Sequence, residues 1–194
     1  MVVQPRDRLI TTGKSLFARL GYEQTSTAAI AREAGSSESQ LMRYFGGKAG
    51  LLDAIFNESW TQVISRFTSE IPPTSPARDT ILGIFRIIID AFGSDHDMAV
   101  LFLFEGRRIR GTEVLLSRGF LQFYQILQSV IRRGQDDGSF RRDLDPVVLT
   151  AALLGAAEGM IRDRLLLERR SVAHPFDDVV IATTFEAIIE GVAG

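Results

Sequence analysis

The chain has 194 residues, of which 45% are hydrophobic and 24% are charged, and it has no cysteine. This composition excludes disordered, collagen-like and coiled-coil proteins, and the missing cysteines exclude disulfide scaffolds, thiolate zinc sites and cysteine nucleophiles. Residues 1–50 hold seven basic and four acidic residues, whereas residues 51–194 hold fifteen and twenty. Such a split is typical of a small basic module joined to a larger body. The apolar runs are too short to span a membrane, and the first residues lack the apolar core of a signal peptide, so we expect a cytoplasmic protein without a membrane partner.

Helical spacing of apolar residues predicts three short helices at the start of the chain. The first ends at Gly21, and the second covers residues 27–34 before Gly35 breaks the chain. The third opens at Ser37 with the spacing of a capping box and ends at Gly46.

The rest of the chain is also predicted to be helical. The expected helices cover residues 48–70, 76–92, 98–109, 112–133 and 145–169, with a last one starting at Pro175. No alternating strand pattern is found, so the predicted fold is all-α with about nine helices.

The strongest functional pattern lies in residues 27–45. Two short helices joined by a tight turn and preceded by a stabilising helix form a helix-turn-helix, whose second helix can enter the major groove of DNA. The face opposite the apolar residues of this helix offers groups that read base edges or hold phosphates, namely Glu38, Ser39, Gln40, Arg43 and Tyr44. Lys48 adds a cation for a phosphate. Periodicity alone leaves open a helical hairpin with a solvated polar face.

The stretch from Phe17 to Leu52 resembles the DNA-binding domain of TetR-family (tetracycline-repressor-like) transcriptional regulators. The residues that carry the resemblance are Thr25, Ile30-Ala31, Ala34-Gly35, Tyr44-Phe45, Lys48 and Leu51-Leu52. The resemblance implies a helix-turn-helix domain over residues 1–47 and a helical effector-binding and dimerisation domain over residues 48–194. It further implies a homodimeric repressor that a small apolar or amphipathic molecule releases from a palindromic double-stranded operator.

The resemblance also assigns roles on the reading face. Thr27 would contact a phosphate, the third helix would face the groove, and its end would hold the DNA backbone. Two positions depart from the family pattern, because Met42 stands where an aromatic residue is common and Ala28 where a basic one is frequent. Glu38 either caps the helix or accepts from a cytosine amino group. The predicted DNA-binding residues are Thr27, Ser37, Glu38, Ser39, Gln40, Met42, Arg43, Tyr44 and Lys48.

Small residues recur along the last two predicted helices. This spacing lets helices approach closely, so paired helices from two subunits would form a four-helix interface. The predicted dimer residues are Ala152, Gly155, Gly159, Thr184, Ala187 and Gly191. Packing of the same residues inside one subunit is the alternative.

Aromatic and embedded acidic residues in the body are candidates for an effector site, because ligand pockets are apolar with few polar anchors. The candidates are Trp60, Phe67, Phe85, Phe102, Glu105, Phe123, Tyr124 and Glu158. For each aromatic residue the alternative is an ordinary core position. For the two acids the alternative is an internal ion pair with Arg108 or Arg162.

No enzymatic function is predicted, because the nucleophile-elbow, phosphate-loop and dinucleotide motifs are all missing from the sequence. Asp95-His96-Asp97 is interpreted as a helix cap rather than a metal site, since adjacent loop residues cannot converge on one ion. No cofactor or metal is therefore expected. The remaining rival is a helical small-molecule-binding or scaffolding protein that has no DNA function.

Overall fold

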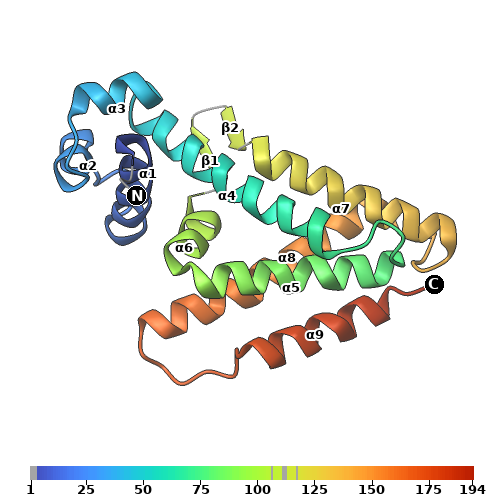
Figure 1. Ribbon diagram of the computed structural model, residues 1–194. Helices are drawn as coiled ribbons and strands as arrows, with labels where there is room; N and C mark the ends of the chain where they lie inside the picture. The colour runs from blue at the N-terminus through green and yellow to red at the C-terminus, as the bar shows by residue number, and fades with distance from the viewer. Residues whose placement is uncertain (1–3, 106, 111–112, 117) are drawn as a thin grey trace. The chain divides into compact units, whose positions relative to one another are not determined.

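The computed structural model describes residues 4–105, 107–110, 113–116 and 118–194, and over these residues the chain is almost entirely helical (Figure 1). The nine helices in this described part are α1 (Pro5–Leu20), α2 (Thr27–Glu33), α3 (Glu38–Phe45), α4 (Lys48–Glu70), α5 (Ala77–Ser94), α6 (His96–Phe104), α7 (Arg118–Asp137), α8 (Pro146–Arg169) and α9 (Asp178–Gly191). The all-α fold class is thereby confirmed.

The structure divides into two compact units. One comprises residues 1–61 and 95–120, and the other comprises residues 62–94 and 121–194. The N-terminal unit thus holds α1 to α3, the start of α4, and α6, whereas the C-terminal unit holds α5, α8, α9 and most of α7. The sequence-based domain boundary at residue 47 remains a prediction.

A small apolar core holds the N-terminal unit together. Leu9, Ile30, Leu41 and Leu51 are completely buried, each from a different one of the first four helices. Burying one such side chain contributes about 1.5–3 kcal/mol, so these four residues fix α1 to α4 on one another. This core holds α3 in place through Leu41.

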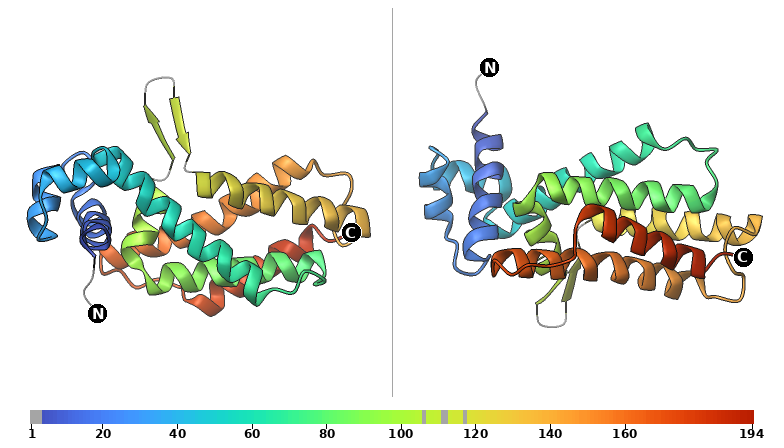
Figure 2. Two further views of the ribbon diagram at one scale, coloured as in Figure 1. Left: turned by 45° about the horizontal axis from the view of Figure 1, so that its top comes forward. Right: turned by 90° about the horizontal axis from the view of Figure 1, so that it is seen from below.

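A two-stranded antiparallel hairpin replaces parts of two predicted helices. Strands β1 (Arg107–Arg110) and β2 (Glu113–Leu116) pair side by side (Figure 2). The prediction of helix over residues 98–109 and 112–133 was therefore wrong for these segments. The register places Ile109 opposite Val114 and Arg110 opposite Glu113. Isoleucine and valine are β-branched residue types that favour strands.

The C-terminal unit is built around α5, whose apolar residues surround the helix on nearly all sides. Its six isoleucine, leucine and phenylalanine positions from residue 81 to residue 88 are all buried. The Phe85 ring stacks on the Phe185 ring of α9, with centroids 3.6 Å apart. Helix α9 begins at Asp178, with Asp177 as its N-cap, and not at the predicted Pro175. None of the helices in the described residues has the length and apolarity to cross a bilayer.

Gly134 of α7 lies where no side chain fits. A Cβ at this position would be 2.3 Å from Phe140 Cδ2 and 2.8 Å from the Ala77 Cβ, and both neighbours are buried. Gly134→Ala is therefore expected to destabilise the protein by about 1–2 kcal/mol, because overpacking outweighs the gain of about 1 kcal/mol in helix propensity. Denaturant unfolding measures the difference. Gly93→Ala, which enters open space on α5, is the control and should not destabilise; equal stabilities for the two variants would contradict the packing.

Candidate nucleic-acid interface

A tight turn joins α2 to α3. Gly35 has φ +58°, a left-handed conformation that glycine adopts without strain, and the Ser36 N–H donates to the Ala31 carbonyl over 2.9 Å. The Ser37 hydroxyl accepts from the Gln40 N–H at 3.2 Å, and the Gln40 side chain accepts from the Ser37 N–H at 3.3 Å. This is the predicted capping box. The Ser26 cap of α2 is confirmed as well, with a bond from the Ala29 N–H.

Arg8 of α1 donates hydrogen bonds to the turn between α2 and α3. Its Nε donates to the Ala34 carbonyl at 3.0 Å and its Nη2 donates to the Gly35 carbonyl at 3.2 Å. These carbonyls end α2, so the guanidinium satisfies acceptors that the helix leaves unpaired. The first helix thus fixes the turn that sets the direction of α3.

The outer face of α3 is exposed and polar. Glu38, Ser39, Met42 and Arg43 are all exposed, and the exposed fraction of Met42 is 53%. The Arg43 guanidinium lies 5.0 Å from the centre of the Tyr44 ring, and its Nη2 donates to the Tyr44 hydroxyl at 3.3 Å. Arginine on the outer face of such a helix is the side chain that most often reads guanine in the major groove.

The side chains of Gln40, Thr27 and Glu38 also bond within the protein. The Gln40 Oε1 accepts from the Ser36 hydroxyl at 2.6 Å as well as from the cap, and Gln40 is half-buried. The Thr27 hydroxyl donates to Glu38 Oε2 at 2.7 Å and so ties the start of α2 to the start of α3. The side chain of Glu38 is therefore directed to Thr27 in this structure. Their roles at DNA remain predictions.

Lys48 at the start of α4 donates hydrogen bonds that stabilise the loop after α1. Its Nζ donates to the Tyr22 carbonyl at 2.8 Å and to the Glu23 carbonyl at 3.4 Å, and it lies 4.3 Å from the centre of the Tyr22 ring. A lysine ammonium has three N–H donors, so one further donor can reach a phosphate while these two bonds persist. The structure thus gives Lys48 a bracing role that the sequence did not indicate.

Lys48→Met is expected to have two effects. Loss of the carbonyl bonds and of the cation–π contact should destabilise the N-terminal unit by about 1–2 kcal/mol. If Lys48 also holds a phosphate, the salt dependence of DNA binding should weaken by about one ion per subunit. Denaturant unfolding and DNA titrations at several salt concentrations measure the two separately. Unchanged stability would contradict the bracing role, and an unchanged salt slope would exclude the phosphate contact.

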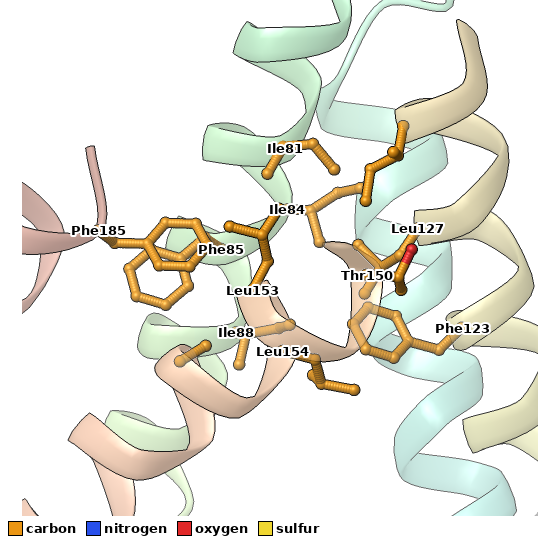
Figure 3. A pocket seen from close by; sticks show the side chains of 12 residues that line it. Ile81, Ile84, Phe85, Ile88, Phe123, Leu127, Thr150, Leu153, Leu154 and Phe185 are labelled. Atoms are coloured by element: carbon orange, nitrogen blue, oxygen red, sulfur yellow. The ribbon is translucent and has the colours of Figure 1, made fainter. Parts of the chain in front are cut away.

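A small apolar cavity of about 30 Å³ lies in the C-terminal unit (Figure 3). Its walls come from α5, α7, α8 and α9, and the residues are Ile81, Ile84, Phe85, Ile88, Phe123, Leu127, Ile131, Thr150, Leu153, Leu154, Ala157 and Phe185. Thr150 supplies the one hydroxyl among them, and it donates to the Pro146 carbonyl of its own helix at 2.6 Å. The cavity therefore suits hydrocarbon.

The structure brings together two of the eight effector candidates at this cavity, Phe85 and Phe123. Phe67 is a neighbour of this lining, because its ring centroid lies 5.9 Å from that of Phe123. Phe185 and the aliphatic residues of α5 were not among the candidates. The signal that could have found them is the apolar surface all around α5, which predicts burial on every side.

The other effector candidates lie elsewhere in the fold. The Trp60 and Phe102 rings contact each other in the N-terminal unit, with centroids 4.5 Å apart. Tyr124 donates its hydroxyl to the Val147 carbonyl at 3.4 Å, and Glu105 Oε1 accepts from the Tyr22 N–H at 3.4 Å. Glu158 is half-buried on α8.

The structure describes the side chain of one of the two arginines that were predicted as partners of these acids. Arg108 lies in β1, outside the residues whose side chains are described, and Arg162 pairs with Asp163 at 3.4 Å. The roles of these acids at an effector remain predictions.

The small residues predicted at a dimer interface face outward. In α8, Val148 and the three predicted residues follow one another at intervals of four, three and four residues. In α9, Val180 and the other three predicted residues have the same intervals. Each set therefore lies on one face of its helix. Helices α8 and α9 pack on each other (Figure 1). All six predicted residues, Ala152, Gly155, Gly159, Thr184, Ala187 and Gly191, are exposed or half-exposed.

The Asp95-His96-Asp97 segment does cap a helix. The Asp95 Oδ1 accepts from the Met98 N–H at 3.0 Å, as expected for the N-cap of α6. Among the described residues no group of three or more histidine, aspartate or glutamate side chains is placed to hold a metal ion.

Comparisons with known proteins agree with the geometry. Residues 9–55 match the family model described as bacterial regulatory proteins, tetR family. The chain is 21% identical over 192 residues to the fatty acid metabolism regulator protein of Bacillus subtilis, covering 95% of this chain and 94% of the relative.

Two solved structures share the fold over nearly the whole chain. The fatty acid degradation regulator FadR from Bacillus halodurans superposes with a TM-score of 0.83 at 16% identity, covering 98% of this chain and 97% of that one. FadR from Bacillus subtilis in complex with stearoyl-CoA gives 0.81 at 18% identity, covering 94% and 96%. Residues 9–55 are thereby identified as a helix-turn-helix of the tetR type, and the whole chain shares the fold of these regulators.

Proposed function

We propose that the protein is a homodimeric repressor that binds a palindromic operator through α3 and is released from it by a long-chain acyl compound. The observation that carries the DNA-binding part is the exposed Arg43 on a helix whose direction is fixed by the capping box and by Arg8. A rigid helix with a free polar face can enter the major groove without reorganising.

The outward stripe of small residues on α8 and α9 supports the homodimer. Val148 is 67% exposed and Gly155 has no heavy atom within 4 Å of the place where its Cβ would be. Small side chains let the backbones of two helices approach closely, and apolar area exposed in this way is typical of a protein interface. A two-fold pair of subunits would present α3 twice, which matches a palindromic site.

The cavity supports a hydrocarbon effector. Its lining is apolar, and its only hydroxyl is occupied by the carbonyl of Pro146. The relative solved with stearoyl-CoA binds a molecule that carries a long hydrocarbon chain. A cavity of about 30 Å³ is far smaller than a long acyl chain. An acyl chain must therefore push the helices around the cavity apart, so its binding is coupled to a change of conformation.

A gel-shift titration tests this function. Operator DNA selected from a random-sequence library by the wild-type protein is bound first, and stearoyl-CoA is then added, with free coenzyme A as the control. We expect stearoyl-CoA to release the DNA and free coenzyme A to leave the complex intact. Release by neither compound would contradict the acyl effector, and equal release by both would show that the hydrocarbon chain is not recognised.

A repressor must also lower transcription from its own operator. A reporter gene placed behind the selected operator is expected to fall in expression when the protein is present and to recover when a long-chain fatty acid is supplied. Higher expression in the presence of the protein would show an activator instead.

A further inference from the structure

Helix α6 is attached to α1 at both of its ends. At its start, Asp95 uses one carboxylate oxygen to cap α6 and the other to pair with the Lys14 ammonium of α1. At its end, the Glu105 carboxylate accepts from the N–H of Tyr22, just after α1. The pairing of α1 with α6 is the most extensive between any two helices in the described residues.

Helix α1 in turn sets the position of the reading helix. Arg8 bonds to the carbonyls of Ala34 and Gly35 in the turn before α3, and Leu9 and Leu16 of α1 are buried in the core of the N-terminal unit. A displacement of α1 therefore changes the support of α3, although no residue of α1 belongs to the predicted DNA-contact set.

The chain connects this attachment directly to the cavity. Asp95 follows Ser94, the last residue of α5, and α5 supplies Ile81, Ile84, Phe85 and Ile88 to the cavity wall. Ile88 precedes Asp95 by seven residues, which is roughly 10 Å along a helix. The covalent chain thus leads from the cavity wall to Asp95 without an intervening loop.

We propose that the Lys14–Asp95 ion pair couples the state of the cavity to DNA binding. This inference rests on the proposed function, and it assigns these two residues a positioning role: they touch neither DNA nor effector but transmit a shift of α5 to α1. The pair is suited to this, because its side chains are 24% and 38% exposed and thus partly shielded from water and salt. Asp95 also caps α6, so a shift of Asp95 acts on α6 through the cap and on α1 through Lys14.

A double-mutant cycle tests the coupling without any ligand. Ala157→Phe places a ring in a space of about 30 Å³ and so imitates a permanently filled cavity. In the otherwise wild-type protein we expect it to weaken binding to the library-selected operator by about tenfold or more. In a Lys14→Met background, and in an Asp95→Asn background that keeps a capping oxygen, we expect the same substitution to weaken binding by less than about threefold.

Two controls keep this result specific. Glu70→Gln removes a carboxylate partner of Arg66 on α4 and should leave the full effect of Ala157→Phe in place. Leu127→Trp fills the cavity from α7 and replaces Ala157→Phe if circular dichroism shows that Ala157→Phe does not fold.

The outcomes separate the coupling from the choice of effector. Equal losses from cavity filling with and without the ion pair would overturn the proposal, and so would normal operator binding by both filled variants. A cycle that shows coupling while stearoyl-CoA fails to release the wild-type protein would support the coupling and reject only the acyl effector.

Discussion

Arg43→Ala is expected to abolish the preference for one base in each half-site and to weaken operator binding strongly. A bidentate arginine–guanine contact contributes about 1–3 kcal/mol, and a dimer makes it twice, so the expected loss is roughly 30-fold to 10⁴-fold. Arg43 is exposed, and its guanidinium contacts the exposed Tyr44 through a long bond of 3.3 Å to the hydroxyl and through the ring face. Both contacts are at the surface, so the guanidinium can leave Tyr44 and turn toward a base. Fluorescence anisotropy with the selected operator and with single-base variants measures both effects.

Arg19→Ala is the matched control for Arg43→Ala. Arg19 is also exposed, but it lies in the last turn of α1, outside the predicted reading face. Its removal should leave the base preference as in the wild type. If Arg43→Ala retained wild-type affinity and selectivity, α3 would not read the operator in the way proposed.

Gly155→Arg is expected to convert the dimer into monomers. The side chain would place a charge at the centre of the small-residue stripe, where two subunits are proposed to approach closely, and a buried unpaired charge is strongly unfavourable. A single subunit binds only one half-site, so it lacks the gain in affinity that comes from binding two half-sites at once. Operator affinity should therefore fall by about 10²-fold or more. Sedimentation velocity measures the mass in solution.

The monomer itself should remain folded, because a Cβ at Gly155 meets no neighbour within 4 Å. Ser129→Arg adds the same charge at an exposed position of α7 and should leave the dimer intact. A Gly155→Arg protein that sediments as a dimer would place the interface elsewhere.

Local signals made the helix-turn-helix predictable. The capping oxygens of Ser26 and Ser37 and the glycine at position 35 act within a few residues of the chain, so their spacing in the sequence determines the geometry that the structure shows. The hairpin was not predicted because the pairing that forms it joins two segments of the chain, and each segment alone also fits helical spacing.

The cavity was only partly predictable for a related reason. Aromatic composition identifies candidates, but tertiary packing decides that Phe85 and Phe123 line the cavity while Trp60 and Phe102 pack in the other unit. The Lys14–Asp95 pair joins residues 81 positions apart, and no local pattern marks such a contact. The cap at Asp95 was predicted, but its second partner was not.

Selection of DNA from a random-sequence library by this protein shows whether α3 is presented twice to a palindromic operator. We expect an enriched inverted repeat whose half-sites lie about 34–36 Å apart, or a multiple of this distance, bound by two subunits. Enrichment of no sequence, or of a site without two-fold symmetry bound by one subunit, would contradict the claim that α3 is presented twice to a palindromic operator.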